Sequence, residues 1–270
     1  MNILKRTLTA LVLLPLVFLL VQFSSRILFF IVIQIIVILA LNEFYNLSQK
    51  KRVYPNKALG IIFSLLIGMT FLLKEFPLGM ALLAGLLIFT IGYLISVKTI
   101  EELMAFPAEL SLTFFGAFYL SFTLNHINLI RNEYGPFYIY FLLAVVFLGD
   151  SFAFFIGKKW GKHKMASLAS PNKTWEGSAA GLFLGTVMGL VVAWVLFGSE
   201  FLLWKVVMIS ILIQIVIQLS DPLESMFKRA AGVKDSSNIL PGHGGVLDRT
   251  DSLVLAIPFF YCILKYLGMN

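Results

Sequence analysis

Long apolar runs separated by short polar stretches dominate this chain. A transmembrane helix needs about 20 mostly apolar residues, and several runs approach that length. They lie near Leu4–Phe23, Ile27–Leu47, Ala58–Leu73, Leu78–Val97, Leu110–Ile127, Phe137–Gly157, Gly177–Phe197, Phe201–Leu219 and Ser252–Leu267. The run after Phe106 is the weakest, because Pro107, Glu109 and several Ser and Thr residues interrupt it. The pattern predicts an all-α, polytopic integral membrane protein with about nine transmembrane helices.

Composition agrees with this prediction and excludes other classes. The 270 residues are 59% hydrophobic and only 13% charged, whereas a soluble domain carries about 25% charged residues. Disordered chains are poor in apolar residues, so disorder is excluded. The single cysteine, Cys262, permits neither an intrachain disulfide nor a thiolate metal site. The net charge of +7 comes from residues between the apolar runs, so we expect no nucleic-acid partner.

The distribution of Lys and Arg predicts the orientation. With the N-terminus placed in the cytoplasm, most of the 21 Lys and Arg residues fall in cytoplasmic segments. Two polar loops, Lys158–Glu176 and Ser220–Asp251, then face the cytoplasm as well. We therefore expect a multi-pass protein of the cell inner (plasma) membrane. Residues 1–135 have short, plain connections and are interpreted as a transmembrane scaffold, and residues 136–270 hold both polar loops and are interpreted as the catalytic region.

Asp150 lies inside an apolar run, in YFLLAVVFLGDSFAFFIG. A carboxylate within a span costs about 2.5–3.5 kcal/mol on insertion scales. It is retained where it faces a cavity, a partner or an ion. We place Asp150 at the wall of a site, and the alternative is a structural pair with a lysine from a neighbouring loop.

Two polar segments offer cationic and capping groups. In SPNKTWEGS, Pro171 and Asn172 predict a turn, Lys173 suits a phosphate, and Thr174 suits a helix cap. A basic loop followed by a capped helix would explain that segment equally well. In SDPLESMFKR, the residues Asp221, Pro222 and Glu224 fit a helix start, and Lys228 and Arg229 follow about two turns later, where they can meet an anion.

The densest polar cluster is PGHGGVLDRTD, residues 241–251, immediately before the last apolar run. Its glycines leave backbone N–H groups accessible to a phosphate. Asp248 and Asp251 are three residues apart, so in a helix they share a face and repel each other unless a cation lies between them. Carboxylate oxygens select Mg²⁺ or a similar hard cation. A capped helix start with a solvated Asp pair is the alternative.

Residues 225–251 resemble the signature of the phosphatidate cytidylyltransferase (CDP-diacylglycerol synthase) family. The pattern is a Ser followed by Lys-Arg, then Lys-Asp, then Pro-x-His-Gly-Gly, then Asp-Arg-x-Asp. The matching residues are Ser225, Lys228, Arg229, Lys234, Asp235, Pro241, His243, Gly244, Gly245, Asp248, Arg249 and Asp251. SPNKTWEG and Asp221 also look like family features.

The resemblance implies transfer of CMP from CTP to phosphatidic acid, which gives CDP-diacylglycerol and pyrophosphate. It implies that Asp221 and Asp248 bind Mg²⁺, with Asp251 close by, and that Asp150 and Asn172 shape the pocket or a second cation site. The triphosphate would contact Lys173, Lys228, Arg229 and the Gly244 and Gly245 amides. The other expected substrate contacts are Ser170, Ser225, Lys234, His243 and Arg249.

Two other functions remain open at this point. A related CTP-dependent enzyme could act on another membrane lipid, such as an isoprenoid ether phosphatidate or a polyprenol. A transporter for a phosphorylated metabolite is disfavoured, because the charges gather in one half of the chain and at one face. Besides CTP, phosphatidic acid and membrane lipids, we expect a second copy of the chain as a partner, in a homodimer.

Overall fold

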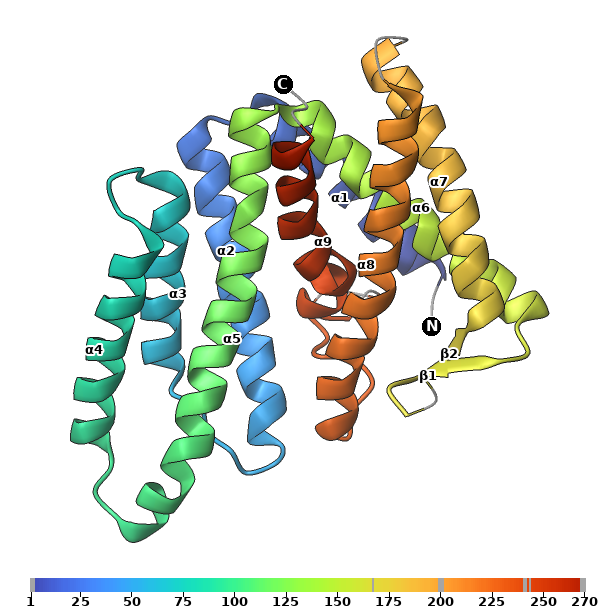
Figure 1. Ribbon diagram of the computed structural model, residues 1–270. Coiled ribbons are helices and arrows are strands. Elements are labelled where there is room, and N and C mark those ends of the chain that lie inside the picture. Colours follow the sequence, from blue (N-terminus) through green and yellow to red (C-terminus); the bar gives the residue numbers. More distant parts are fainter. Residues whose placement is uncertain (1–2, 167, 199–201, 240–241, 243, 268–270) are drawn as a thin grey trace. The chain divides into compact units, whose positions relative to one another are not determined.

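The computed structural model describes all residues except 1–2, 167, 199–201, 240–241, 243 and 268–270. Over the described residues it contains nine helices and one small sheet (Figure 1). The helices are α1 (Ile3–Phe23), α2 (Arg26–Gln49), α3 (Lys57–Leu72), α4 (Leu78–Ser96), α5 (Ile100–Glu133), α6 (Pro136–Trp160), α7 (Trp175–Phe197), α8 (Leu203–Ala230) and α9 (Leu247–Tyr266). Each predicted apolar run therefore forms a helix.

Among the residues that the structure describes, six helices are long and apolar enough to cross a membrane, namely α2, α4, α5, α6, α7 and α8. The 16-residue α3 is shorter than a usual span. The chain is thus an all-α, polytopic membrane protein, as predicted, while the count of about nine spans and the cytoplasmic N-terminus stay predictions.

Two helices continue through a proline, where Pro107 was expected to interrupt an apolar run and Pro222 was expected to begin a helix. Helix α5 includes Pro107, and α8 includes Pro222. The predicted helix start at Asp221 is therefore wrong, because Asp221 lies in the last third of α8. A proline inside a helix removes one backbone N–H and so one bond to the carbonyl four residues earlier. Helix α8 nevertheless continues past Pro222 to Ala230.

The polar loop between α6 and α7 contains a short antiparallel hairpin, which Figure 1 shows in yellow. Strand β1 (Lys164–Ala166) pairs with β2 (Ser170–Thr174), with Lys164 opposite Thr174 and Ala166 opposite Ser170. The turn predicted at Pro171 and Asn172 is wrong, because both residues lie in β2. In a two-stranded sheet each strand has an unpaired edge, where a proline is tolerated.

The chain forms two compact units, which are described separately. The first comprises Met1–Asn128 and Ala231–Arg249, and the second comprises Leu129–Ala230 and Thr250–Asn270. The division into a scaffold of residues 1–135 and a catalytic region of residues 136–270 stays a prediction. However, the segment from Ala231 to Arg249, which holds much of the signature, belongs to the amino-terminal unit.

Buried polar side chains join the helices of the first unit. Gln34 donates to the side-chain oxygen of Asn125 at 2.5 Å, linking α2 to α5. The Tyr45 hydroxyl donates to the backbone carbonyl of Thr113 at 2.7 Å, and the Tyr93 hydroxyl lies 2.9 Å from the Thr113 hydroxyl. Such bonds hold helices together where lipid offers no alternative partner.

In the second unit, α6, α7 and α8 pack around Gln214. The Gln214 side chain donates to the backbone carbonyl of Val145 at 2.7 Å. It fits there because Gly149 and Gly185 have no side chain, since a Cβ on either would collide with the Gln214 amide. Close approach through glycine is typical of membrane helices.

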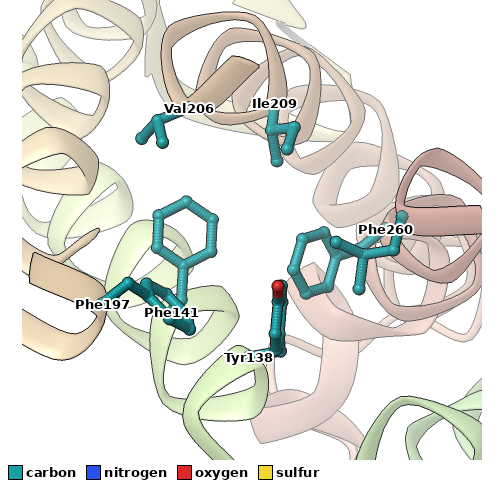
Figure 2. A pocket seen from close by; sticks show the side chains of 7 residues that line it. Tyr138, Phe141, Phe197, Val206, Ile209 and Phe260 are labelled. Carbon is teal, nitrogen blue, oxygen red and sulfur yellow. The ribbon is translucent and has the colours of Figure 1, made fainter. Parts of the chain in front are cut away.

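An apolar pocket lies elsewhere in the second unit (Figure 2). It is lined by Tyr138, Phe141, Phe197, Val206, Ile209, Phe260 and Leu264. Asp221 lies about 18 Å farther along α8 than Ile209, at a rise of 1.5 Å per residue. The pocket is therefore part of the core and not the predicted polar site.

Candidate functional site

Lys173 and Asp221 form an ion pair in the second unit. Lys173 is carried by β2 and Asp221 by α8, and Lys173 Nζ lies 2.6 Å from Asp221 Oδ2. The two side chains are 22% and 24% exposed, so both remain accessible to a small ligand. Ser225, one turn further along α8, donates to Asp221 Oδ1 at 3.3 Å. Three residues predicted from two separate motifs thus meet at one place.

Two further predicted carboxylates belong to the same unit. Asp150 Oδ2, from α6, accepts a hydrogen bond from the Ser252 hydroxyl of α9 at 2.7 Å. The Ser220 hydroxyl of α8 donates to the backbone carbonyl of Asp251. These contacts join α6, α8 and α9 and bring Asp150 and Asp251 toward the pair of Lys173 and Asp221.

Asp251 precedes the apolar segment Ser252–Leu267 and sits in a negative environment. Desolvation raises the pKa of Asp251 to about 7, and the negative charges of Asp221 and Asp150 raise it as well. Lys228 acts in the opposite direction. Carboxylates that raise one another's pKa form a site that a cation would stabilise.

The two basic residues in the last turn of α8, Lys228 and Arg229, have carboxylate and carbonyl partners. Lys228 Nζ lies 2.9 Å from Glu224 Oε1, and the two side chains are 9% and 3% exposed. Arg229 Nε donates to the backbone carbonyl of Ala169, in the hairpin, at 3.4 Å. A phosphate that used Lys228 would have to compete with Glu224 for it.

The hairpin is anchored at both ends. The Thr174 hydroxyl accepts a hydrogen bond from the backbone N–H of Gly177 at 3.2 Å, which confirms Thr174 as the cap of α7. The Glu176 carboxylate accepts from the backbone N–H groups of Lys162 and His163, at 3.1 and 3.2 Å. Of the other residues predicted in the hairpin, Ser170 is half-buried and Asn172 is exposed.

Asp248 lies in the first unit, in the first turn of α9. Its Oδ2 accepts three hydrogen bonds of 2.9 Å, from the backbone N–H and the hydroxyl of Ser236 and from the backbone N–H of Gly245. The Gly245 amide, predicted to face a phosphate, is therefore engaged within its own loop. This amide is not among the proposed phosphate contacts.

Glu43 is a residue that sequence reasoning missed. It lies on α2, is 1% exposed, and accepts hydrogen bonds from Ser236, Ser237, Val246 and Leu247. The signal was present, because Glu43 stands inside the apolar run Ile27–Leu47 just as Asp150 stands inside its own. The rule that singled out Asp150 applies equally to Glu43.

The remaining predicted residues lie in the polar segment from Lys234 to Arg249. Gly244 has a positive φ of 82°, a conformation that glycine adopts readily. Lys234, Asp235 and Arg249 are exposed. Pro241 and His243 lie outside the described residues.

The structure thus gathers Asp150, Lys173, Asp221, Lys228 and Asp251 in one unit, and Gly244, Gly245 and Asp248 with Glu43 in the other. Over the described part of the chain, no group of three or more His, Cys, Asp or Glu side chains is placed to hold a metal ion. Asp221 and Asp251 nevertheless supply hard oxygen donors. Such a partial set fits Mg²⁺, which binds one or two carboxylates together with substrate phosphates and water.

Comparison with known proteins adds a family match. The model of the Cytidylyltransferase family matches residues 4–267. A Staphylococcus saprophyticus protein named phosphatidate cytidylyltransferase is 43% identical over 134 residues, which cover 50% of this chain and 51% of that protein. Proteins of the same name from Bacillus subtilis and Brucella abortus are 40% and 38% identical, over 55% and 64% of each chain. The chain therefore spans between half and two thirds of the length of these relatives.

Proposed function

We propose that this chain, which belongs to the Cytidylyltransferase family, transfers CMP from CTP to phosphatidic acid. The products are CDP-diacylglycerol, a precursor for phospholipid synthesis, and pyrophosphate. The observation that carries the proposal is the group formed by Lys173, Asp221 and Asp251 at the polar ends of apolar helices. A nucleotide from water and a lipid from the membrane would meet there. The names of the relatives support this substrate pair.

The chemistry requires positioning and charge neutralisation more than a protein nucleophile. The phosphate of phosphatidic acid would attack the α-phosphorus of CTP directly, and the bond to the β-phosphate would break. A phosphomonoester is already anionic near neutral pH, so no strong general base is required. His243 is therefore assigned to contact a phosphate or to brace the loop.

Cationic groups from two elements would bind the triphosphate. Lys173 of β2 and Lys228 and Arg229 of α8 are the proposed phosphate contacts, together with the Gly244 amide. Lys173 and Lys228 are each paired with a carboxylate. Binding of CTP would exchange these carboxylates for phosphate oxygens, so that each ammonium group keeps an anionic partner. Lys234 and Arg249 are exposed and would balance the remaining charge.

Mg²⁺ is the proposed cofactor, held by Asp221, Asp248 and Asp251. When bound, the ion supplies positive charge that favours attack on the α-phosphorus and departure of pyrophosphate. Asp150 and Asn172 are proposed to shape the pocket or to hold a second cation. Ser225 would orient Asp221 through the bond described above, and Ser170 would support the neighbouring hairpin.

We also propose on which side of the membrane the site lies and how the chain assembles. The Lys and Arg distribution favours an active site on the cytoplasmic face of the inner membrane. The proposed assembly is a homodimer. The mass of the protein in detergent micelles tests this proposal directly. Monomeric protein with full turnover would exclude dimerisation as a requirement.

Turnover is the deciding experiment. Purified protein in detergent receives phosphatidic acid and labelled CTP, with and without Mg²⁺, and the assay detects lipid-soluble cytidine product and pyrophosphate. We expect both products only with Mg²⁺. Folded protein that accepts a polyprenyl or isoprenoid ether phosphate but not phosphatidic acid would change the lipid assignment and keep the reaction. Folded protein that accepts no lipid would exclude the proposed activity.

A further inference from the structure

We propose that Glu43 is a positioning residue that holds the two ends of the segment 236–247, at Ser236–Ser237 and Val246–Leu247, in the arrangement that binds the nucleotide. This inference rests on the proposed function and extends it to the amino-terminal half of the chain. Glu43 comes from α2, almost 200 positions before the segment that it contacts. The amino-terminal helices, interpreted above as scaffold, would then contribute directly to the shape of the site.

The Glu43 carboxylate closes the segment at both ends. At one end its Oε2 accepts from the Ser236 hydroxyl at 2.9 Å, and its Oε1 accepts from the Ser237 hydroxyl at 2.6 Å. At the other end, Oε1 accepts from the Val246 N–H at 3.0 Å and Oε2 from the Leu247 N–H at 2.8 Å. One side chain thus fixes the separation between the start and the end of the segment.

Because the Glu43 carboxylate is buried, it depends on these hydrogen bonds. A carboxylate that is 1% exposed is stable only if other groups replace the water that it has lost. Four neutral donors do so here, and all four belong to the segment. If the segment moved, the Glu43 carboxylate would lose these bonds. If the charge of Glu43 were removed, the buried N–H groups would lose their acceptor.

The same contacts reach Asp248 through Ser236. The Ser236 hydroxyl lies 2.9 Å from both Glu43 Oε2 and Asp248 Oδ2. A hydroxyl has one proton, so the two carboxylates share a single donor. Glu43 therefore helps to orient Asp248, a proposed magnesium ligand, through Ser236.

Gly245 supplies independent support. A Cβ on Gly245 would overlap the Ser236 hydroxyl and the Glu43 carboxylate. Glycine is required at this position because Glu43 occupies the space that a side chain would need. Gly245→Ala should therefore push Glu43 out of place while leaving its charge intact, which makes it a second route to the same defect.

A purely structural role for Glu43 makes a different prediction from a positioning role. A structural defect would loosen the whole protein and change the affinity for both substrates. A defect in the shape of one segment would change the kinetics of CTP alone. The two roles are separated by comparing the KM for CTP with the KM for phosphatidic acid.

The test compares full-length wild type with Glu43→Gln, Gly245→Ala and Ser237→Ala. Gln34→Leu is the matched control, because Gln34 is also buried on α2 but bonds to Asn125 and not to the segment. Hydrogen–deuterium exchange of peptides covering residues 231–249, without nucleotide, reports whether Glu43 holds the segment. Steady-state kinetics with Mg²⁺ then give both KM values and kcat.

We expect Glu43→Gln to speed exchange in residues 231–249 and to raise the KM for CTP about tenfold or more, the scale of hydrogen bonds to a charged group. The KM for phosphatidic acid should stay within about twofold of wild type. Gly245→Ala should behave like Glu43→Gln, and Ser237→Ala should show a smaller effect in the same direction. If Glu43→Gln does not fold, these two variants decide. Gln34→Leu should lower the melting temperature without separating the two KM values.

Three results would overturn the inference. Unchanged exchange in residues 231–249 of Glu43→Gln would show that Glu43 does not hold the segment. Faster exchange with an unchanged KM for CTP would show that the segment's shape does not matter to the nucleotide. Equal increases in both KM values would indicate general loosening. Wild-type protein without any turnover would instead exclude the proposed function, and the exchange measurement would still decide whether Glu43 holds the segment.

Discussion

Lys173 and Asp221 form a direct ion pair, with 2.6 Å between Nζ and Oδ2. Under the proposed function, the Lys173 ammonium group binds a phosphate and the Asp221 carboxylate binds a cation. In the ion pair, each of these groups is bound to the other. Magnesium-bound CTP carries both of the charges that would replace the pair. The exchange keeps both charged groups partnered at every stage, which avoids the cost of a partly buried and unpaired charge.

Removal of Lys173 should therefore have opposite effects on nucleotide and metal. In Lys173→Ala, we expect the KM for CTP to rise about tenfold, because a charge-assisted bond to phosphate is lost. The Mg²⁺ concentration that gives half-maximal activity should fall, since the lysine no longer competes for Asp221. Lys162→Ala is the control, because Lys162 is an exposed lysine next to the same hairpin. A parallel loss of affinity for both ligands would contradict the exchange.

The proposed magnesium ligands can be tested with isosteric variants. Asp221→Asn, Asp248→Asn and Asp251→Asn should each lower kcat/KM by at least about 100-fold, the usual scale for loss of one transition-state charge contact. Partial recovery at high Mg²⁺ would be expected for a weakened ligand. The exposed Glu101, changed to Gln, serves as the control. Full activity of Asp248→Asn with unchanged Mg²⁺ dependence would remove Asp248 from the metal site.

Lys228 can be assigned by pairing its substitution with that of Glu224. Lys228→Met removes a counter-charge from a carboxylate that is 3% exposed, so we expect the free energy of unfolding to fall by about 3 kcal/mol. Adding Glu224→Gln should restore most of that stability, which thermal unfolding in detergent measures. Activity should stay low in the double variant if Lys228 binds phosphate. Recovery of both stability and activity would reduce Lys228 to a structural role.

Hydrophobic pattern predicted the fold well, because the helices are set by local apolar content. All nine runs form helices, and the carboxylate at Asp150 was recognised by its cost within a span. The sequence did not predict the path of α8 through Pro222, since membrane helices tolerate a proline where neighbouring groups satisfy the freed backbone carbonyl. It also did not predict that β2 would contain Pro171 and Asn172.

Long-range partners are the part of the site that sequence could not supply. Glu43 stands out by its position in an apolar run, but nothing in its neighbourhood indicates that its donors come from residues 236–247. The same holds for Lys173 and Asp221, which were predicted separately and meet only through packing of β2 on α8. Contacts between distant segments depend on how the helices pack. The spacing of residues along the chain does not indicate which segments pack together.

Asp150 offers the sharpest choice between a structural and a functional interpretation. Its carboxylate accepts a hydrogen bond from Ser252 at 2.7 Å, and removal of that donor in Ser252→Ala should lower the free energy of unfolding by about 1 kcal/mol. Asp150→Asn keeps the shape and removes the charge. If Asp150 shapes the pocket or holds a second cation, Asp150→Asn should lower kcat/KM while the melting temperature stays equal to or above that of wild type. Ser151→Ala is the control, since Ser151 is exposed and bonds only within its own helix, to the carbonyl of Phe147. A lower melting temperature with full activity of the remaining folded protein would assign Asp150 to structure.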